Sequence, residues 1–158
     1  MTSKQRNKNR GQCEKRLRSE LLQMQTNPPP LCSACLKNDD LYEWKAAIEG
    51  PPESPYEGGK FVLDLKFTPQ YPFSPPKVKF VTKIYHCNIS NRGEICVDLL
   101  DVNWTPAMTV SSLMLSICSL LTDANPNSPL NHTAAQLYTM NRTLHDVNAK
   151  IYTEKYAK

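Results

Sequence analysis

Residues 42–49 read Tyr-Glu-Trp-Lys-Ala-Ala-Ile-Glu, and residues 60–67 read Lys-Phe-Val-Leu-Asp-Leu-Lys-Phe. In both stretches every second side chain is apolar, which is the period of a half-buried strand. Glycine and proline gather between the two stretches, in residues 50–59, and indicate a turn. Residues 77–81 continue the alternation, and residues 38–40 mark an earlier turn. Short connections without an intervening helix predict an antiparallel meander of four strands.

Helical patterns lie on both sides of these strands. Residues 12–25 have leucines at helical spacing, and the prolines at 28–30 end that helix because proline cannot continue one. Thr109 is a suitable N-cap for an apolar helix over residues 110–121. Two more helices are predicted for residues 131–140 and 142–157. The order of helix, strands, loop and three helices is typical of an α+β domain.

Charge is concentrated at the N-terminus. Seven basic residues and one acidic residue give residues 1–18 a net charge of +6, whereas the rest of the chain sums to −2. Such a basic segment can contact acidic surfaces or nucleic acid, but a solvated leader is the simpler interpretation. We therefore expect residues 1–11 to form a disordered basic extension, residues 12–158 to form one folded domain, and no nucleic-acid partner.

The sequence gives no sign of export or membrane insertion. The first twenty residues are polar and basic, without the apolar stretch of a secretory signal peptide. No run approaches the roughly 20 apolar residues that a membrane span needs. We therefore expect a cytoplasmic and/or nuclear protein without membrane contact, in which the six cysteines form no structural disulfide.

Most of the cysteines have structural interpretations. Cys118 lies in the most apolar helix and is predicted to fill the core, as free cysteines commonly do. Cys13 is near a polar helix start, and we expect it to be incidental. Cys32 and Cys35 have the spacing of half a zinc site, but no second pair of ligands has matching spacing, so no metal site is predicted.

Cys96 lies in a different setting. It follows Gly93 within residues 82–108, a stretch of little periodicity, and long irregular stretches in compact domains are usually functional. Asn88 lies eight residues before it, and no nearby histidine is evident as a proton-accepting partner of the thiol. This arrangement suits a thiol that carries an activated acyl group better than one that hydrolyses a bond.

Six blocks of sequence, in order and at matching spacing, resemble the ubiquitin-conjugating enzyme family over about residues 12–158. The chain is most similar to the short, promiscuous class that works with many RING and HECT ligases. The blocks are Ser54-Pro55-Tyr56-Glu57-Gly58-Gly59, Tyr71-Pro72-Phe73-Ser74-Pro75-Pro76-Lys77-Val78, Ile84-Tyr85-His86-Cys87-Asn88, Gly93-Glu94-Ile95-Cys96-Val97-Asp98, Trp104-Thr105-Pro106-Ala107 and Asn125-Pro126-Asn127-Ser128-Pro129-Leu130.

The resemblance implies the ubiquitin-conjugating fold and the carriage of ubiquitin as an acyl group. An activating enzyme would hand ubiquitin to Cys96 as a thioester. The chain would then pass ubiquitin to a lysine of a protein substrate with a RING ligase, or to the cysteine of a HECT-type ligase. No cofactor or metal is expected, because ATP is used by the activating enzyme.

The resemblance also implies roles for residues around the thiol. Asn88 would either donate its amide to the oxyanion, typically worth roughly 10²–10³ in rate, or hold the loop in shape. Asp98 would help to position the attacking lysine, and His86 would be structural. Ser128 would act as a gate, and Tyr85 and Leu130 would line the channel.

Two surfaces follow from the same resemblance. The shared site for the activating enzyme and the ligases would contain Lys15, Arg16, Phe73, Thr105, Pro106 and Ala107. An exposed aromatic anchor with a basic rim is typical of an interface hot spot. Ser33 matches a position on the back face at which some members bind a second, non-covalent ubiquitin.

Cys87 departs from the family, which has proline between this histidine and asparagine. Proline would fix the backbone angle of the loop, so cysteine adds freedom there. We expect retained but slower activity, and a second thiol that could trap ubiquitin or form a disulfide with Cys96.

Three other functions remain open from the sequence. The chain could be a catalytically weak or inactive scaffold that binds ubiquitin and ligases, although such variants lack the cysteine. It could load another modifier such as SUMO or NEDD8. A cysteine hydrolase would need His132 or His145 to activate the thiol, and both lie on predicted helices after the site.

Overall fold

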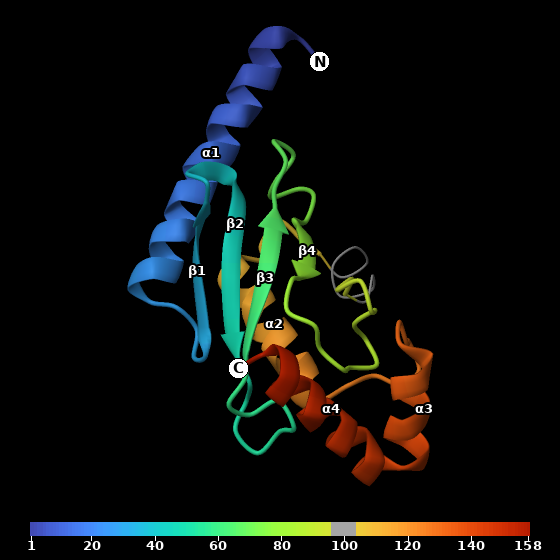
Figure 1. The fold of residues 1–158 in the computed structure, drawn as a ribbon. Coiled ribbons are helices and arrows are strands. Elements are labelled where there is room, and N and C mark those ends of the chain that lie inside the picture. The colour runs from blue at the N-terminus through green and yellow to red at the C-terminus, as the bar shows by residue number, and fades with distance from the viewer. Residues whose placement is uncertain (96–103) are drawn as a thin grey trace.

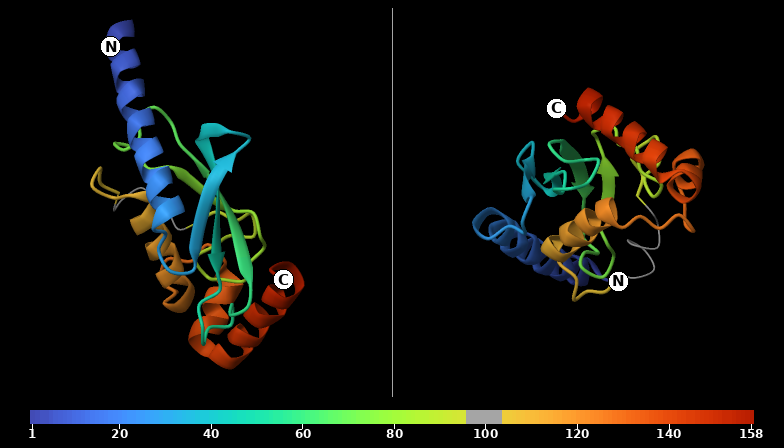
Figure 2. Two further views of the ribbon diagram at one scale, coloured as in Figure 1. Left: turned by 90° about the vertical axis from the view of Figure 1, so that its left-hand side faces the viewer. Right: turned by 90° about the horizontal axis from the view of Figure 1, so that it is seen from below.

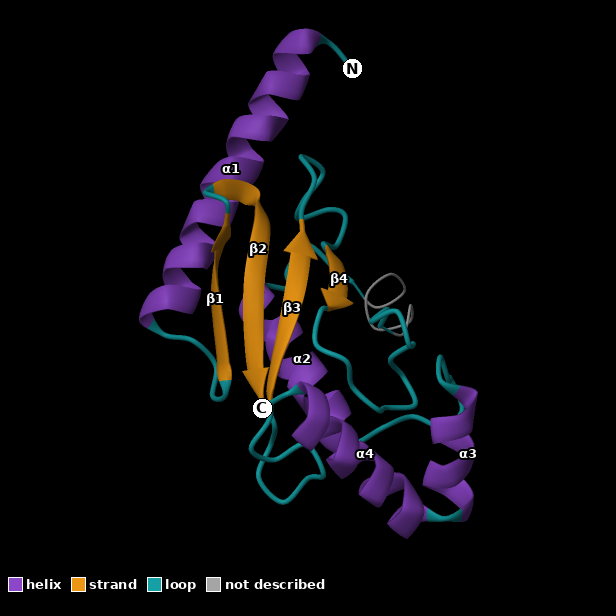
Figure 3. Ribbon diagram, in the orientation of Figure 1, coloured by secondary structure: helices purple, strands orange, loops and turns teal. Residues whose placement is uncertain are grey.

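The computed structural model describes residues 1–95 and 104–158. It has the expected α+β architecture and element order, with a four-stranded antiparallel sheet (Figures 1 and 3). Helices α1 and α2 lie along one face of the sheet, and α3 and α4 pack at one end of it (Figure 2). The elements are α1 (Ser3–Thr26), β1 (Cys32–Lys37), β2 (Asp40–Glu49), β3 (Lys60–Lys66), β4 (Lys77–Phe80), α2 (Val110–Thr122), α3 (His132–Met140) and α4 (Arg142–Tyr156).

The meander is built by local turns and by the alternation of side chains. The strands pair in the order β1-β2-β3-β4, with Trp44 opposite Leu65 and Leu63 opposite Phe80. These four side chains are buried, whereas alternate positions on the same strands are more exposed. A short turn joins β1 to β2 through Asn38–Asp39, with φ values of 53° and 56°. Asparagine and aspartate tolerate this left-handed region better than most residues do, which explains why the turn forms there.

The core lies between the sheet and helices α1 and α2. Leu17 and Met24 of α1 are buried at helical spacing, as are Leu113, Met114 and Ile117 of α2. Thr109 caps α2 as expected, because its hydroxyl accepts a hydrogen bond from the N–H of Ser112 at 3.1 Å. Among residues 1–95 and 104–158, no helix has the length and apolar character needed to cross a bilayer.

The prediction of a disordered segment at residues 1–11 was wrong. Helix α1 begins at Ser3, not Gln12, and its first turns project past the end of the sheet (Figure 1). Thr2 and Gln5 form a capping box in which each side chain accepts a hydrogen bond from the other residue's backbone, at 3.1 and 2.9 Å. The lysine, arginine and glutamine residues that follow have unbranched side chains that lose little freedom in a helix. The missing apolar period therefore meant an exposed helix rather than disorder.

The cysteines also differ in part from expectation. Cys13 is buried, and its thiol donates a hydrogen bond to the carbonyl of Thr68 at 3.5 Å, so it joins α1 to the loop after β3 and is not incidental. Cys118 is half-buried against the core. Cys32 is buried while Cys35 is exposed on the same strand, so the two thiols do not converge on one ion.

Candidate active site

The loop after β4 folds back on that strand and leads to the position of the candidate thiol. The N–H of Phe80 donates to the carbonyl of Gly93 at 2.9 Å, and the N–H of Ser90 donates to the carbonyl of Glu94 at 2.9 Å. Gly93 has φ +87°, and a Cβ atom there would lie 2.1 Å from the carbonyl oxygen of Phe80. Glycine is therefore required at this crossing. Ile95, the last described residue before the gap, is buried.

Asn88 is the centre of the best-defined hydrogen-bond network in the loop. Its side chain is fully buried. The amide nitrogen donates to the carbonyls of Asn125 at 2.7 Å and Ser128 at 2.9 Å, and the amide oxygen accepts from the N–H of Asn125 at 2.8 Å. Both N–H groups of the amide are thus engaged with backbone oxygens. In this arrangement the side chain holds residues 125–128 against the loop.

The side chain of His86 joins the same loop to the C-terminal part of α2. Its Nε2 lies 2.7 Å from the carbonyl oxygen of Leu120, and its Nδ1 accepts from the N–H of Asn88 at 2.9 Å. A neutral ring protonated on Nε2 satisfies both partners. Burial lowers the pKa of His86 to about 4, the nearby His145 adds to the effect, and the bond to Leu120 opposes it. The ring is therefore neutral near pH 7 and bonded on both sides.

Cys87 lies in the same loop and is fully buried. Its carbonyl accepts the N–H groups of Leu130 at 2.8 Å and Asn131 at 3.0 Å. Its thiol lies 3.8 Å from the side-chain oxygen of Asn88, and burial raises the pKa of the thiol. A buried thiol with a raised pKa is a poor nucleophile. Among the described residues, no backbone or side-chain group of another residue accepts the N–H of Cys87, so proline would lose no hydrogen bond to that part of the chain.

The other predicted residues near the thiol have different settings. Ser128 and Leu130 are partly exposed and are brought to the loop through their backbone bonds to Asn88 and Cys87. Tyr85 is buried, with its ring centroid 5.5 Å from that of His145 and 5.4 Å from that of Tyr152 on α4. The side chain of Tyr85 therefore faces α4, and its role as a channel wall stays a prediction.

Cys96 and Asp98 lie outside the described residues. The structure describes the segments that precede and follow them in the chain, namely the loop up to Ile95 and the segment that begins at Trp104. It also describes residues 125–131, which bond to the loop. The roles expected of Cys96 as nucleophile and of Asp98 in positioning lysine stay predictions.

A second surface forms where α1 meets two proline-containing loops. The guanidinium of Arg16 donates to the carbonyls of Pro106 and Met108, both at 2.8 Å. The indole N–H of Trp104 donates to the carbonyl of Pro72 at 2.8 Å, next to Phe73, which is 78% exposed. These bonds hold the three segments together and engage the partly exposed Arg16 with backbone carbonyls. The other predicted residues of this surface are exposed, namely Lys15, Thr105, Pro106 and Ala107.

Glu20 is a buried carboxylate that the sequence did not reveal as important. It accepts from the hydroxyl of Tyr71 at 2.6 Å, from the N–H of Val110 at 2.7 Å and from Nε of Arg16 at 3.0 Å. Burial and the bond to Glu20 raise the pKa of Tyr71. One side chain thus joins α1, the first loop and the N-terminus of α2, where a negative charge is favoured. Its i,i+4 spacing from Arg16 was visible in the sequence, but its distant partners were not.

Ser33 of β1 lies on the solvent-facing side of the sheet, opposite the side that α1 and α2 cover. The strand register places it opposite Ala47, which in turn lies opposite Val62. Ser33 is exposed and the other two are partly exposed. A row of small and apolar residues is therefore accessible across the middle of this face.

Within residues 1–95 and 104–158, no group of three or more metal-binding side chains converges.

Comparisons with known proteins agree with this geometry. A family model described as "Ubiquitin-conjugating enzyme" matches residues 16–153. The E2 domain of a ubiquitin conjugating enzyme from Toxoplasma gondii is 42% identical, with a TM-score of 0.85, over 92% of this chain and 99% of that one. A putative ubiquitin conjugating enzyme from Plasmodium yoelii is 40% identical, with a TM-score of 0.86, over 90% of this chain and 94% of that one.

Proposed function

Because the chain belongs to the ubiquitin-conjugating enzyme family, we propose that it carries ubiquitin as a thioester on Cys96. It passes ubiquitin to a substrate lysine with a RING ligase or to the cysteine of a HECT-type ligase. The observation that carries this proposal is the family match over residues 16–153, which contains Cys96 and the whole network around Asn88. We further propose that the protein acts in the cytoplasm and/or the nucleus.

The proposed reaction has two acyl transfers. In the first, the thiolate of Cys96 attacks the thioester carbonyl of ubiquitin on the activating enzyme, and the sulfur of that enzyme's cysteine leaves. In the second, a neutral lysine amine attacks the thioester on Cys96, an amide bond forms, the amine loses a proton to solvent, and the sulfur of Cys96 leaves as thiolate. A thioester is already activated, so the protein mainly needs to position the reactants and favour the neutral amine.

Asn88 acts in this proposal as a positioning residue. Its two N–H groups hold the carbonyls of Asn125 and Ser128, which supports loop organisation over donation to the oxyanion. His86 continues the same frame to Leu120 as a neutral ring. Ser128 then contributes to the gate beside the thiol, and Leu130 to the channel, from a segment that Asn88 and Cys87 hold in place. Asp98 orients the incoming lysine.

Phe73 is the proposed anchor for the activating enzyme and the ligases. It is 78% exposed beside a loop whose own position is held by Trp104 and Arg16. Lys15, Thr105, Pro106 and Ala107 form the rest of this contact surface, while Arg16 supports it from within. On the other face, the row of Ser33, Ala47 and Val62 supports a weak site for a second ubiquitin.

A charging assay tests the proposal. The purified chain is incubated with ubiquitin, ubiquitin-activating enzyme and ATP, and the products are separated with and without reducing agent. We expect a band one ubiquitin heavier that disappears on reduction. In Cys96→Ser the band should persist on reduction, because an oxygen ester resists thiols, and Cys118→Ser should behave as wild type.

The outcome separates the remaining alternatives. Absence of the band from folded protein would contradict ubiquitin carriage. The same assay with SUMO or NEDD8 and their own activating enzymes would then distinguish another modifier from an inactive scaffold.

A further inference from the structure

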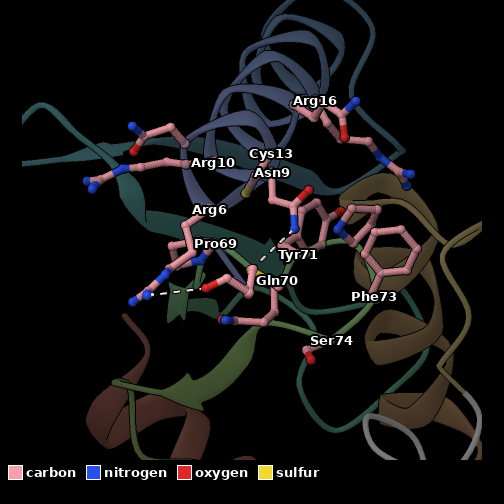
Figure 4. Close-up of a pocket in the computed structure, with 14 residues that line it drawn as sticks. Arg6, Asn9, Arg10, Cys13, Arg16, Pro69, Gln70, Tyr71, Phe73 and Ser74 are labelled. Carbon is pink, nitrogen blue, oxygen red and sulfur yellow. Dashed lines mark hydrogen bonds between the residues drawn. The ribbon is translucent and has the colours of Figure 1, made fainter. Parts of the chain in front are cut away.

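A groove of about 740 Å³ runs between the N-terminal half of α1 and the loop at residues 69–74 (Figure 4). One wall is the helix, with Arg6, Asn9, Arg10 and Cys13 along the same face. The groove depends on residues between positions 1 and 13, all of which lie outside the part of the chain that matches the family model. It is therefore a feature of this chain's own N-terminal helix.

The helix wall carries positive charge, and among the described residues no acidic side chain lines the groove to balance it. Of the residues that line it, three are arginines and none is acidic. Arg16 is occupied by Glu20 and by two backbone carbonyls. Arg6 has one exposed bond of 3.4 Å to the carbonyl of Met1. Arg10 has a contact of 3.8 Å with the partly exposed Glu14, and its guanidinium lies 5.8 Å from the ring centroid of Tyr42. Exposed contacts of this kind contribute little, so Arg6 and Arg10 can pair with a ligand.

The opposite wall is mainly apolar, with the polar side chains of Gln70 and Ser74 at its edges, and has no cation among its described residues. It consists of Pro69, Gln70, Tyr71, Pro72, Phe73 and Ser74, with the ring of Phe73 exposed. A ligand that fits both walls carries negative charge along one side and an apolar group along the other. A nucleic-acid strand fits less well, because strand-binding grooves stack successive bases on several aromatic rings, and the described residues give this groove one exposed ring, that of Phe73.

We propose that this groove binds an acidic segment of a partner protein. Carboxylates of the segment pair with Arg6 and Arg10, and an apolar side chain of the segment packs against Phe73. Binding also stabilises the first turns of α1, which are exposed and gain little from packing of their own. The site shares Phe73 with the surface proposed for the activating enzyme and the ligases, but binding of the acidic segment requires neither Cys96 nor ubiquitin.

The two faces of α1 provide a matched test of the proposal. With 3.6 residues per turn, Lys4 and Lys8 lie on the side of the helix opposite Arg6 and Arg10, and neither lines the groove. The variants Arg6→Glu/Arg10→Glu and Lys4→Glu/Lys8→Glu therefore change the net charge equally but only the first changes the groove. Glutamate is as good a helix former as lysine or arginine, and circular dichroism verifies that α1 is intact in both.

The probe is a fluorescein-labelled peptide of twelve residues with six acidic side chains and a central Leu-Phe pair. Binding to the full-length chain is followed by fluorescence anisotropy. We expect the arginine variant to bind at least about tenfold more weakly, the size expected for lost charge-assisted hydrogen bonds, and the lysine variant to stay within about twofold of wild type. Phe73→Ala, or Ser-Ser in place of the Leu-Phe pair, should also weaken binding.

Three results would overturn the proposal. These are no saturable binding of the peptide at concentrations up to about 1 mM, equal weakening by the two charge-reversal pairs, or tighter binding of a twelve-nucleotide single strand with the same sensitivity to Arg6 and Arg10. Because no thioester takes part, failure here would leave the proposed ubiquitin carriage standing, and failure of charging would leave this measurement valid.

Discussion

Among single residues, Asn88 makes three side-chain hydrogen bonds to the backbone of residues 125–128 while fully buried. Replacing it with alanine removes a partner from two carbonyls and one N–H, although the carbonyl of Asn125 keeps a bond of 3.3 Å from the N–H of Ser128. We expect Asn88→Ala to lower the free energy of unfolding by roughly 2–4 kcal/mol, because an unsatisfied buried group costs about 1–3 kcal/mol. Urea denaturation measures the change.

Asn88→Asp separates the donors of this side chain from its acceptor. The carboxylate can still accept from the N–H of Asn125, but it faces the carbonyls of Asn125 and Ser128 with no hydrogen to donate. We expect this variant to be less destabilised at pH 4 than at pH 7 relative to wild type, since protonation restores one donor. A loss below about 0.5 kcal/mol for Asn88→Ala, the range of ordinary surface substitutions, would contradict the positioning role.

Cys87 provides a second prediction at the residue scale. Its buried thiol has a raised pKa, so we expect no thioester on Cys87 when Cys96→Ala is incubated with the charging components. The sequence had suggested that this thiol could trap ubiquitin, and its burial argues against that expectation. Any reducible ubiquitin band in Cys96→Ala that Cys87→Ser removes would show that the thiol is accessible.

Cys87→Pro tests the effect of the departure from the family sequence. Proline restricts the backbone, and no hydrogen bond from the N–H of Cys87 is lost among the described residues. We expect a stability equal to wild type or higher by about 0.4–1 kcal/mol, and faster discharge of ubiquitin to free lysine from a more rigid loop. Single-turnover discharge measures the rate, and a rate equal to that of wild type would refute the expectation.

The lowered pKa of the buried His86 leads us to expect that the folded protein loses stability in acid. Its pKa is about 4 in the folded protein against 6.5 for an ordinary histidine, so between these values the unfolded chain binds a proton that the folded chain does not. The contribution of neutral His86 is present above pH 6.5 and is lost as the pH falls toward 4, by up to about 1.4 kcal/mol per pH unit. We expect His86→Gln to be less stable at pH 7 and to show a smaller decrease from pH 7 to pH 4.5.

The exposed His132 serves as the control for this pH dependence. Other groups titrate in the same range, so the informative quantity is the difference in slope between each variant and wild type. His132→Gln should keep the slope of wild type. Equal slopes for wild type and His86→Gln would mean that His86 does not govern the acid response.

At the scale of elements, we expect substitution of glycine by alanine to have opposite effects on stability at two positions. Gly11 lies within α1, and a Cβ atom there would meet nothing within 4 Å. Gly11→Ala should therefore stabilise the protein by about 0.5–1 kcal/mol and increase its helical circular dichroism. Gly93 has φ +87° and its Cβ would clash with the carbonyl of Phe80, so Gly93→Ala should cost more than about 2 kcal/mol. Thermal unfolding of both variants tests the pair, and a neutral Gly11→Ala would argue against a helix that extends to Ser3.

At the scale of the whole molecule, Glu20 couples three elements that are far apart in the sequence. It joins the N-terminus of α2 to Arg16 of α1 and to Tyr71 of the first loop. We expect Glu20→Ala to destabilise the protein by roughly 2–4 kcal/mol, since buried donors lose a charged partner. Hydrogen exchange should increase in residues 69–74 and 104–110 together. Glu14→Ala, which removes a partly exposed carboxylate without a partner outside α1 among the described residues, should leave exchange there unchanged.

The amino-acid sequence by itself determined the elements and their order. Alternating residues predicted β2, β3 and β4, and helical spacing predicted the helices after residue 109. The turn at Asn38–Asp39 and the cap at Thr109 follow from side chains that act on their own neighbours. The cap at Thr2 and Gln5 was equally local and could have predicted the start of α1. The segment has no apolar period, and such a period indicates burial of one helix face rather than helix formation itself.

Only the tertiary structure decided which distant groups meet. Asn88 binds residues about 37–40 positions away, and Glu20 and Arg16 bind residues about 90 positions away. Such bonds leave no mark in the sequence around either partner, because their formation depends on how the sheet and helices bring the chain together. The groove beside α1 has the same origin: its charges are evident in the sequence, but the apolar wall that faces them comes from residues 69–74.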